Sequence, residues 1–599
     1  MNNFFASIER TCSEFAKRRW LAVLAVGALA ILARVALLPW QHVPQPKVHD
    51  EFSYLLAGDT FAHGRLANPP HPMWIFFDTF HVIQHPVYAS MYPPGQGMAL
   101  AVGKLLGLGQ PWIGVVLSVA AMSMAFTWML QAWVPEEWAL VGGLLVWSRF
   151  GVFSYWVNSY WGGAVAATGA ALVLGAFARI RERESVRDAA ILGIGAGILA
   201  ISRPLEGAIF FAPVGAALVW WGFRCKVPER RARIRKQILL PVALILACVA
   251  GFVGYYNNRL TGSPLAFPHF IEQKMITTAI FLWQHDKPPI VYDNPQFDDF
   301  YHNFLPSLYQ ASWPAAVGQW WYKSTDFWEF FLGPALSIPF LALPWVFIER
   351  RNRLLFVQVA LSALGLWVVV YYHAHYAAPL MATLFVLLML CMRTLCRFRM
   401  LGRDVGVALT RLIVAFSLLI GPVYFAQSLI PQPNAAFEWL HRHAALVIGI
   451  SVVALGLSRL AGSATTKAVA GPRAWLGASF EFLLIILIVF QLCELQRNLY
   501  ADAFPYVDDV NEPFRKPVED QLAAMPGEHL VLVRYSKDHN SGEEYVYNEA
   551  DIDRAKTVWA REIPGRDVAP LLQYFRNRDV WIYEPDEDDS AARPYDAGE

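Results

Sequence analysis

The sequence is poor in charge: only 16% of its 599 residues are Asp, Glu, Lys or Arg, whereas a soluble domain carries roughly 25%. This shortage excludes an ordinary water-soluble protein, and a net charge of +1 gives no reason to expect a nucleic acid partner. Cysteine is also scarce, with six residues, and no two of them share a long segment between apolar blocks. Disulfides are therefore not expected to hold such segments together. Internal repeats and low-complexity linkers are lacking as well.

Long apolar runs are abundant instead, since 56% of residues are hydrophobic and the mean hydropathy is +0.34. Each run is long enough for a helix to cross about 30 Å of hydrocarbon, where only helices satisfy their own backbone. The first run follows Lys17-Arg18-Arg19 and is too long for a signal peptide, so we expect it to be retained. The sequence predicts an α-helical integral membrane protein with about thirteen transmembrane helices, at 20–38, 111–133, 138–156, 161–178, 188–203, 205–223, 237–256, 327–348, 354–372, 376–392, 405–427, 443–460 and 476–496.

The basic residues are concentrated in six short segments between these helices, which hold 25 of the 49 Lys and Arg residues. Short loops rich in Lys and Arg stay on the cytoplasmic side of a membrane, so all six are predicted to be cytoplasmic. The weak point is Pro135-Glu136-Glu137, which must turn inside without a positive charge. A short apolar stretch at 95–108 is expected to run along the outer interface.

This topology divides the chain into three parts. Residues 1–19 form an amphipathic cytoplasmic N-terminus, and 20–497 form a transmembrane module with outer loops at 39–94 and 257–326. The highly charged segment 498–599 is predicted to be a small soluble α/β domain in the periplasm. Its strands are expected at 529–535 and 579–583, and its helices at 549–560 and 568–576.

Two adjacent carboxylates, Asp50 and Glu51, open the first outer loop. Neighbouring side chains diverge by about 100° on a helix, so the two cannot share one proton. Acidic residues are common in the first turn of a helix, and this structural role alone would explain such a pair. The functional alternative is that one carboxylate faces a substrate while a hydrogen-bonding or basic partner holds the other.

Histidine gathers in the same loop, where six of the 15 histidines lie between residues 42 and 85. Histidines beside carboxylates can bind zinc, but none of these stands at the spacing of a His-Glu-x-x-His zinc site. Hydrogen bonding and phosphate contact are therefore the favoured roles.

Several basic side chains are predicted at the outer ends of helices, where a charge needs a partner. Snorkelling to the interface, or pairing with Glu206, would explain them singly. Their convergence on one face instead favours a cationic cup for a lipid phosphate. The candidates are Arg149, Arg203, Lys274, His373 and His375.

A basic N-terminus, one helix and an outer loop opening with Asp50-Glu51 resemble the GT-C glycosyltransferases, in particular the lipid A aminoarabinose transferases and the protein O-mannosyltransferases. Tyr92-Pro93-Pro94 is similar to the Pro-Pro motif of the former family, and the segment 375–379 to its Arg-Tyr-x-x-Pro motif. Two positions depart from the family, which often has Lys before Pro-Pro and Arg in place of His375.

The resemblance implies a GT-C-like fold and an inverting transfer of a sugar from a polyprenyl-phosphate donor to an acceptor hydroxyl. Asp50 would be the base, as the first acid of the pair is in the family, and Glu51 would orient it or bind sugar hydroxyls. Polyprenyl phosphate leaves as an anion, so positive charge suffices, and neither a metal nor another cofactor is expected. Further substrate contacts are expected from Tyr54, Asp78, His85, Tyr92 and Tyr376.

The expected partners are the lipid-linked donor, membrane lipids and an acceptor that the sequence does not identify, and the expected location is a bacterial inner membrane. Three alternatives stay open. A lipid-linked saccharide transporter or flippase would place ionisable residues midway along its helices. An O-antigen ligase-like enzyme would depend on Arg and His rather than on Asp50, and a non-catalytic scaffold would depend on the C-terminal domain.

Overall fold

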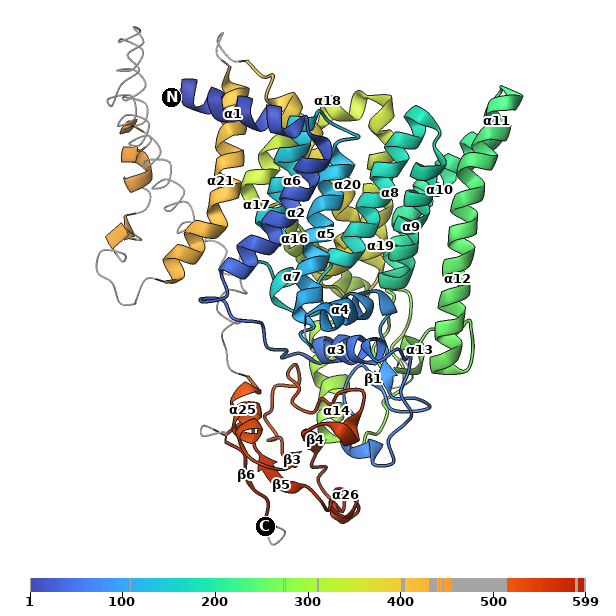
Figure 1. Ribbon diagram of the computed structural model, residues 1–599, viewed down its shortest axis with the longest axis vertical. Coiled ribbons are helices and arrows are strands. Elements are labelled where there is room, and N and C mark those ends of the chain that lie inside the picture. The colour runs from blue at the N-terminus through green and yellow to red at the C-terminus, as the bar shows by residue number, and fades with distance from the viewer. Residues whose placement is uncertain are drawn as a thin grey trace.

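The computed structural model describes residues 2–107, 109–272, 274, 276–309, 312–399, 404–429, 514–587 and 591–596, together with several positions between 439 and 454. A bundle of long helices forms most of this part, and a small domain at the C-terminus lies against one end of the bundle (Figure 1).

Seven helical segments of the described residues are long and apolar enough to cross a membrane, or eight if a bent pair counts as one crossing. This makes the chain a multi-pass membrane protein. The seven are α2 (Arg19–Ala36), α5 (Trp112–Leu130), α8 (Ala164–Arg183), α10 (Pro204–Arg224), the run Pro228–Thr261, the run Ala374–Leu395 and α21 (Val405–Ser428). The run Pro228–Thr261 joins α11 (Pro228–Ile234), η2 (Arg235–Leu239) and α12 (Leu240–Thr261), and the run Ala374–Leu395 joins η6 (Ala374–Ala377) and α20 (Ala378–Leu395).

Three further predicted crossings are helices of 15 to 17 residues, shorter than the roughly 20 that span hydrocarbon. They are α6 (Glu136–Phe150), α9 (Val186–Ser202) and α19 (Arg353–Val368). The predicted helix 443–460 is described at only a few positions, and 476–496 lies outside the described residues. The number thirteen therefore stays a prediction.

The crossing predicted at 327–348 is broken rather than straight. Helix α16 (Trp313–Phe331) meets the segment Gly333–Ile348 at 94°. Gly333 has a φ of +63°, a left-handed conformation that favours glycine, and a proline follows it. The second arm consists of α17 (Gly333–Ser337), η4 (Ile338–Ala342) and α18 (Leu343–Ile348).

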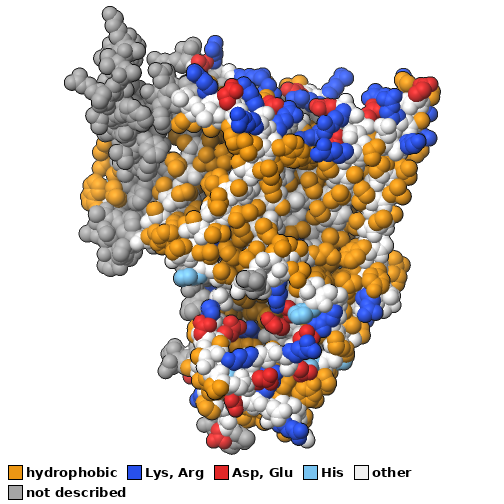
Figure 2. Space-filling model, viewed as in Figure 1, with side chains coloured by type: hydrophobic (Ala, Val, Ile, Leu, Met, Phe, Trp, Pro, Cys, Tyr) orange, Lys and Arg blue, Asp and Glu red, His pale blue; other side chains and the backbone are white. Residues whose placement is uncertain are grey.

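Lys and Arg gather at the end of the bundle away from the C-terminal domain, beyond an apolar band with few charges (Figure 2). At this arginine-rich end, helix α1 (Asn2–Ala16) and the turn before α6 lie close together (Figure 1). Arg19 pairs with Glu136 at 2.5 Å. The turn that lacks a positive charge of its own therefore receives one from the start of α2.

The opposite end, here called the domain end, holds the two long loops. The first contains α3 (His49–Ala62), η1 (Trp74–Phe77), β1 (Val82–Ile83) and β2 (Ala89–Ser90), and α4 (Pro94–Leu106) follows it. Helices α3 and α4 lie side by side across this end of the bundle (Figure 1). The second loop contains α13 (His269–Glu272), α14 (Pro295–Asp299), η3 (Phe300–Phe304) and α15 (Leu305–Leu308).

The C-terminal domain is built on a four-stranded mixed sheet in the order β4-β3-β5-β6. The predicted strands are present as β3 (His529–Val533) and β5 (Asp579–Tyr583). The helix predicted at 549–560 is wrong, because Thr557–Arg561 is strand β4 and pairs with β3 in parallel. The Val558 and Ala560 side chains of β4 pack in the hydrophobic core on one face of the sheet. This tertiary contact overrides the local helix propensity of the segment. The remaining elements are α25 (Lys516–Ala524), η8 (Ile552–Arg554), α26 (Ala569–Tyr574) and β6 (Arg593–Pro594).

A buried ion pair inside this domain holds Glu544, which connects the domain to the first loop. Arg561 donates to Glu544 at 2.7 Å, and both side chains are 1% exposed. The Glu544 carboxylate also accepts a hydrogen bond from Thr79, and its backbone N–H donates to the Lys47 carbonyl at 3.1 Å. The C-terminal domain thus directly supports the segment that leads into α3.

Candidate active site at the domain end

Helix α3 begins at His49, and Glu51 in its first turn holds that beginning in place. The Oε2 atom of Glu51 accepts the backbone N–H of Lys47 at 3.0 Å and of Val48 at 3.5 Å. Its Oε1 atom accepts the N–H of Tyr160 at 3.0 Å. A carboxylate in the first turn satisfies N–H groups that the helix leaves open and suits the helix dipole. Glu51 therefore ties α3 to the segment after α7 (Tyr155–Asn158).

The Glu51 side chain is buried, with 5% of the residue exposed. Burial raises the pKa of Glu51 to about 7, although the backbone N–H groups of Lys47, Tyr160 and Val48 oppose this rise. The two functional alternatives for this acid were orienting Asp50 and binding a sugar. The contacts are those of a residue that positions α3.

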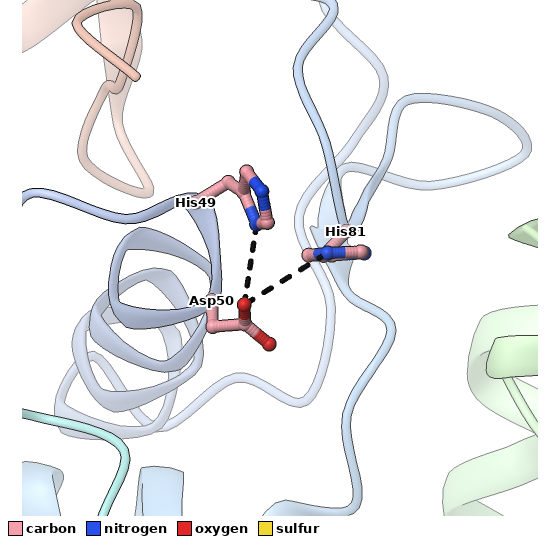
Figure 3. A group of neighbouring side chains, drawn as sticks. All are labelled: His49, Asp50 and His81. Atoms are coloured by element: carbon pink, nitrogen blue, oxygen red, sulfur yellow. Dashed lines mark ion pairs between the residues drawn. The ribbon is translucent and has the colours of Figure 1, made fainter. Parts of the chain in front are cut away.

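Asp50 points the other way, into a cluster at the surface of α3 (Figure 3). Its Oδ1 accepts a hydrogen bond from the Tyr92 hydroxyl. Its Oδ2 lies 3.2 Å from His49 Nδ1 and 4.0 Å from His81 Nε2. The side chain keeps 19% exposure, so a small group can still reach it.

The charge state of Asp50 follows from these neighbours. Burial alone would raise the pKa of its carboxyl, but the charge of His81 and the hydrogen bonds from His49 and Tyr92 outweigh burial and hold the pKa well below its usual range. Asp50 is therefore ionised at any pH at which the protein would work.

Arg203 brings positive charge to the same place from the junction of α9 and α10. Its guanidinium lies 4.2 Å above the ring of Tyr376 and interacts electrostatically with Tyr54 and Tyr92. The rings of Tyr54 and Tyr92 stack at 4.4 Å. Glu206, one turn along α10, also acts on Arg203 and offsets part of its charge. A wall of tyrosines thus lies between the carboxylate of Asp50 and the cation of Arg203.

Two histidines before α20 lie beside Arg203. The rings of His373 and His375 stack at 5.6 Å, and both residues interact electrostatically with Asp50 and with Arg203. His375 is buried, and its Nδ1 lies 3.0 Å from the Tyr155 hydroxyl. His373 is exposed. Two of the predicted phosphate contacts therefore adjoin Arg203.

An apolar hollow leads away from this cluster between α10, α19 and α20. Tyr376 lines it, so the residue under the Arg203 guanidinium forms one end of the hollow. Its walls are otherwise mostly aliphatic, from Leu205, Ile209, Gly365, Leu366, Val369 and Leu380, but they also include Glu206. The hollow is therefore apolar along most of its wall and carries one acidic side chain.

Four predicted site residues lie elsewhere. Arg149 donates to the carbonyls of Glu329 and Phe330 at the break after α16, where helix-end carbonyls lack partners. Lys274 is exposed beyond α13, and His85 is exposed beside Trp74. Asp78 interacts electrostatically with Arg561 of the C-terminal domain.

Sequence reasoning missed two features of the site. Arg34 is buried within α2 and donates to Asn158 at 2.9 Å and to the carbonyls of Gln41 and His42 at 3.0 and 2.9 Å. It holds the chain where the first loop leaves the bundle, and an arginine inside an apolar run could have drawn attention to it. The pairing of His49 with His81 across Asp50 had no such signal, because it depends on how the loop folds back.

No protein-family model and no curated protein matches the chain. Among solved structures, it is similar to ArnT from Cupriavidus metallidurans in the apo state, with 15% identity over 93% of each chain and a TM-score of 0.43. The same protein bound to undecaprenyl phosphate gives 13% identity over 94% of this chain and 93% of that one, also with a TM-score of 0.43. The Archaeoglobus fulgidus oligosaccharyltransferase in complex with Zn and sulfate gives 12% identity, 94% and 67% coverage, and a TM-score of 0.40.

Proposed function

We propose that this protein is an inverting glycosyltransferase that moves a sugar from a polyprenyl-phosphate donor to an acceptor hydroxyl. One observation carries the proposal: an ionised carboxylate, Asp50, and the guanidinium of Arg203 both lie within electrostatic range of His373 and His375. An apolar hollow begins at the Tyr376 ring beneath Arg203. An acid, a cation and an apolar hollow beside them are the three parts that such a transfer requires.

The donor would bind with its phosphate at Arg203 and its first isoprene units along the hollow. A planar guanidinium forms paired hydrogen bonds with phosphate oxygens. His373 and His375 would add further donors. The sugar would then lie over the tyrosine wall, toward Asp50.

Transfer would proceed in one displacement at the anomeric carbon. The acceptor oxygen forms the new bond as the bond to the phosphate oxygen breaks, and the configuration inverts. The electron pair leaves with the phosphate, where Arg203 stabilises the developing charge. The acceptor proton passes to Asp50. A carboxylate of low pKa is a weak base, so the proton should move late, when the attacking oxygen has become acidic.

The arrangement of the chain follows the charge pattern. The arginine-rich end would face the cytoplasm, which places the N-terminus inside and the domain end in the periplasm of a bacterial inner membrane. We also propose a GT-C-like fold with about thirteen transmembrane helices. In this fold the chain would divide into a cytoplasmic N-terminus at 1–19, a transmembrane module at 20–497 and a periplasmic domain at 498–599.

The test is release of polyprenyl phosphate from a panel of labelled polyprenyl-phosphate sugars by the purified full chain. We expect at least one donor to be consumed, and Asp50→Asn to slow release by roughly 10²- to 10⁴-fold, the usual contribution of a general base. The matched control is Asp293→Asn, which changes a carboxylate that is 82% exposed in the second loop. Unchanged release by Asp50→Asn, or an equal loss in the control, contradicts the proposal.

A further inference from the structure

We propose that His49, Asp50 and His81 form a binding site for a divalent transition metal of the zinc type. The three side chains come from two places in the chain, the start of α3 and the loop before β1, and all of them point toward a common centre (Figure 3). One ligand atom from each residue lies within 4.8 Å of the other two.

The spacing is close to that of a tetrahedral ion. Zinc binds imidazole nitrogen and carboxylate oxygen at about 2.0–2.2 Å, which places neighbouring tetrahedral ligands roughly 3.3 Å apart. The separation of His49 Nδ1 and Asp50 Oδ2 is 3.2 Å, and that of His81 Nε2 and Asp50 Oδ2 is 4.0 Å. The ligand atoms of the two histidines lie within 4.8 Å of each other, so the His81 ring must move closer to both partners to complete the set.

One ring nitrogen of His49 faces the proposed ion. The residue is only 7% exposed, and its Nδ1 lies 3.2 Å from Asp50 Oδ2. Its Nε2 forms no hydrogen bond among the described residues. An ion bound to Nδ1 and Oδ2 would replace the direct contact between these two atoms.

The surroundings of His49 are those of a dry site. Its ring packs against Phe80 at 5.2 Å and Phe300 at 5.0 Å, and edge-on against His81 at 4.5 Å. An apolar shell strengthens charge interactions with a bound ion. Asp50 supplies the negative charge that the ion requires.

The backbone of His81 is held in an uncommon conformation that aims its ring at Asp50. Its φ is +61°, in the left-handed region that L-residues seldom occupy. The Ser53 hydroxyl and the Met91 N–H both donate to its carbonyl, at 2.7 and 3.2 Å. Ser53 belongs to α3, so the helix that carries Asp50 also fixes the loop that carries His81.

The ligand set selects the metal. Mg²⁺ and Ca²⁺ prefer sites made only of oxygen, whereas two imidazoles and one carboxylate suit Zn²⁺ and its first-row neighbours. Three protein ligands leave a fourth position for water or a phosphate oxygen. The resemblance implied that no metal is needed, whereas this geometry favours a bound metal.

The ion's use in sugar transfer rests on the proposed function, but its binding does not. With Asp50 Oδ2 as a ligand, Oδ1 would still accept the hydrogen bond from Tyr92. The ion would add positive charge for the departing phosphate beside that of Arg203.

The experiment measures metal binding alone, without any donor. The full chain, purified without a histidine tag and stripped with a chelator, is titrated with Zn²⁺ against a chromophoric competitor, and separately with Co²⁺. We expect one equivalent of Zn²⁺ and the intense visible absorption of tetrahedral Co²⁺. His49→Ala and His81→Ala should each weaken Zn²⁺ binding by at least about 100-fold, because loss of even an outer-shell partner weakens it 10- to 100-fold.

The matched control is His63→Ala, which removes an exposed histidine at the far end of α3 and should bind as the wild type does. His81→Asn guards against misfolding, because Asn also tolerates a left-handed backbone; it should keep the wild-type melting temperature and still lose tight binding. No saturable equivalent, a six-coordinate Co²⁺ spectrum, or wild-type affinity in both His81 variants overturns the proposal. Donor consumption by the metal-free protein would leave the transferase proposal standing and refute only the ion's use.

Discussion

Replacing Glu51 by alanine tests whether this acid holds α3 or contacts the substrate. The carboxylate accepts two hydrogen bonds of 3.0 Å, from the backbone N–H groups of Lys47 and Tyr160. Alanine leaves both donors without an acceptor in a buried place. We therefore expect the start of α3 to loosen from the segment after α7.

The size of this effect follows from those two bonds. Above pH 7 the Glu51 carboxyl is mostly ionised. A hydrogen bond to a charged group contributes about 1.5–3 kcal/mol, and each 1.4 kcal/mol is tenfold in an equilibrium constant. Local opening should therefore become roughly 10- to 150-fold more frequent at each amide. The longer Val48 contact, at 3.5 Å, should add little.

Hydrogen exchange read by mass spectrometry measures this opening directly in peptides that contain Lys47 and Tyr160. The control is Glu549→Ala, which removes a glutamate that is 60% exposed at the same end of the bundle. Donor consumption should fall in Glu51→Ala together with the faster exchange. Unchanged exchange with activity as low as that of Asp50→Asn would refute the positioning role and indicate direct substrate contact.

Three further predictions concern stability. Arg561→Met leaves Glu544 charged and buried, so it should destabilise the docked C-terminal domain by roughly 3–5 kcal/mol, seen as a lower unfolding midpoint and early proteolysis of that domain; an unchanged midpoint would contradict the buried pair. Because burial raises the pKa of Glu51 to about 7, the folded protein holds this proton to a higher pH than the unfolded chain, and the resulting stability is lost as the pH rises from roughly 4.3 through 7. The melting temperature of Glu51→Gln should decline less than that of the wild type over that pH range. Equal slopes of melting temperature against pH in the two proteins would contradict the raised pKa of Glu51. Arg34→Leu removes donors from Asn158 and two carbonyls, so about 2–5 kcal/mol of stability should be lost by thermal unfolding, whereas an exposed Arg34 would give no change.

The sequence was sufficient for features that depend on composition and local spacing. Apolar runs located the seven helical segments that are long and apolar enough to cross a membrane, and the Lys and Arg pattern predicted a common end for the basic loops, where Arg19 and Glu136 meet. Short apolar runs located β3 and β5. Each of these follows from period and solvent preference along the chain alone.

The features that the sequence did not predict depend on contacts between distant segments. In the sequence, Arg149 cannot be distinguished from an ordinary interfacial arginine. Its role depends on the break at Gly333, which places two backbone carbonyls within its reach. His81 meets Asp50 only because Ser53 and Met91 hold the loop back on α3. The strand at 557–561 formed where a helix was expected because β3 offered it a partner.

The central claim is that Arg203 holds a lipid phosphate next to Asp50. Native mass spectrometry of the protein released from native lipid, with phospholipid and added polyprenyl phosphate at equal concentration, measures this binding without chemistry. We predict that the wild type and Asp50→Asn retain one polyprenyl phosphate. Arg203→Ala should lose most of it, while Arg259→Ala, an exposed arginine at the end of α12, should retain it. Equal retention by Arg203→Ala and Arg259→Ala would contradict the account.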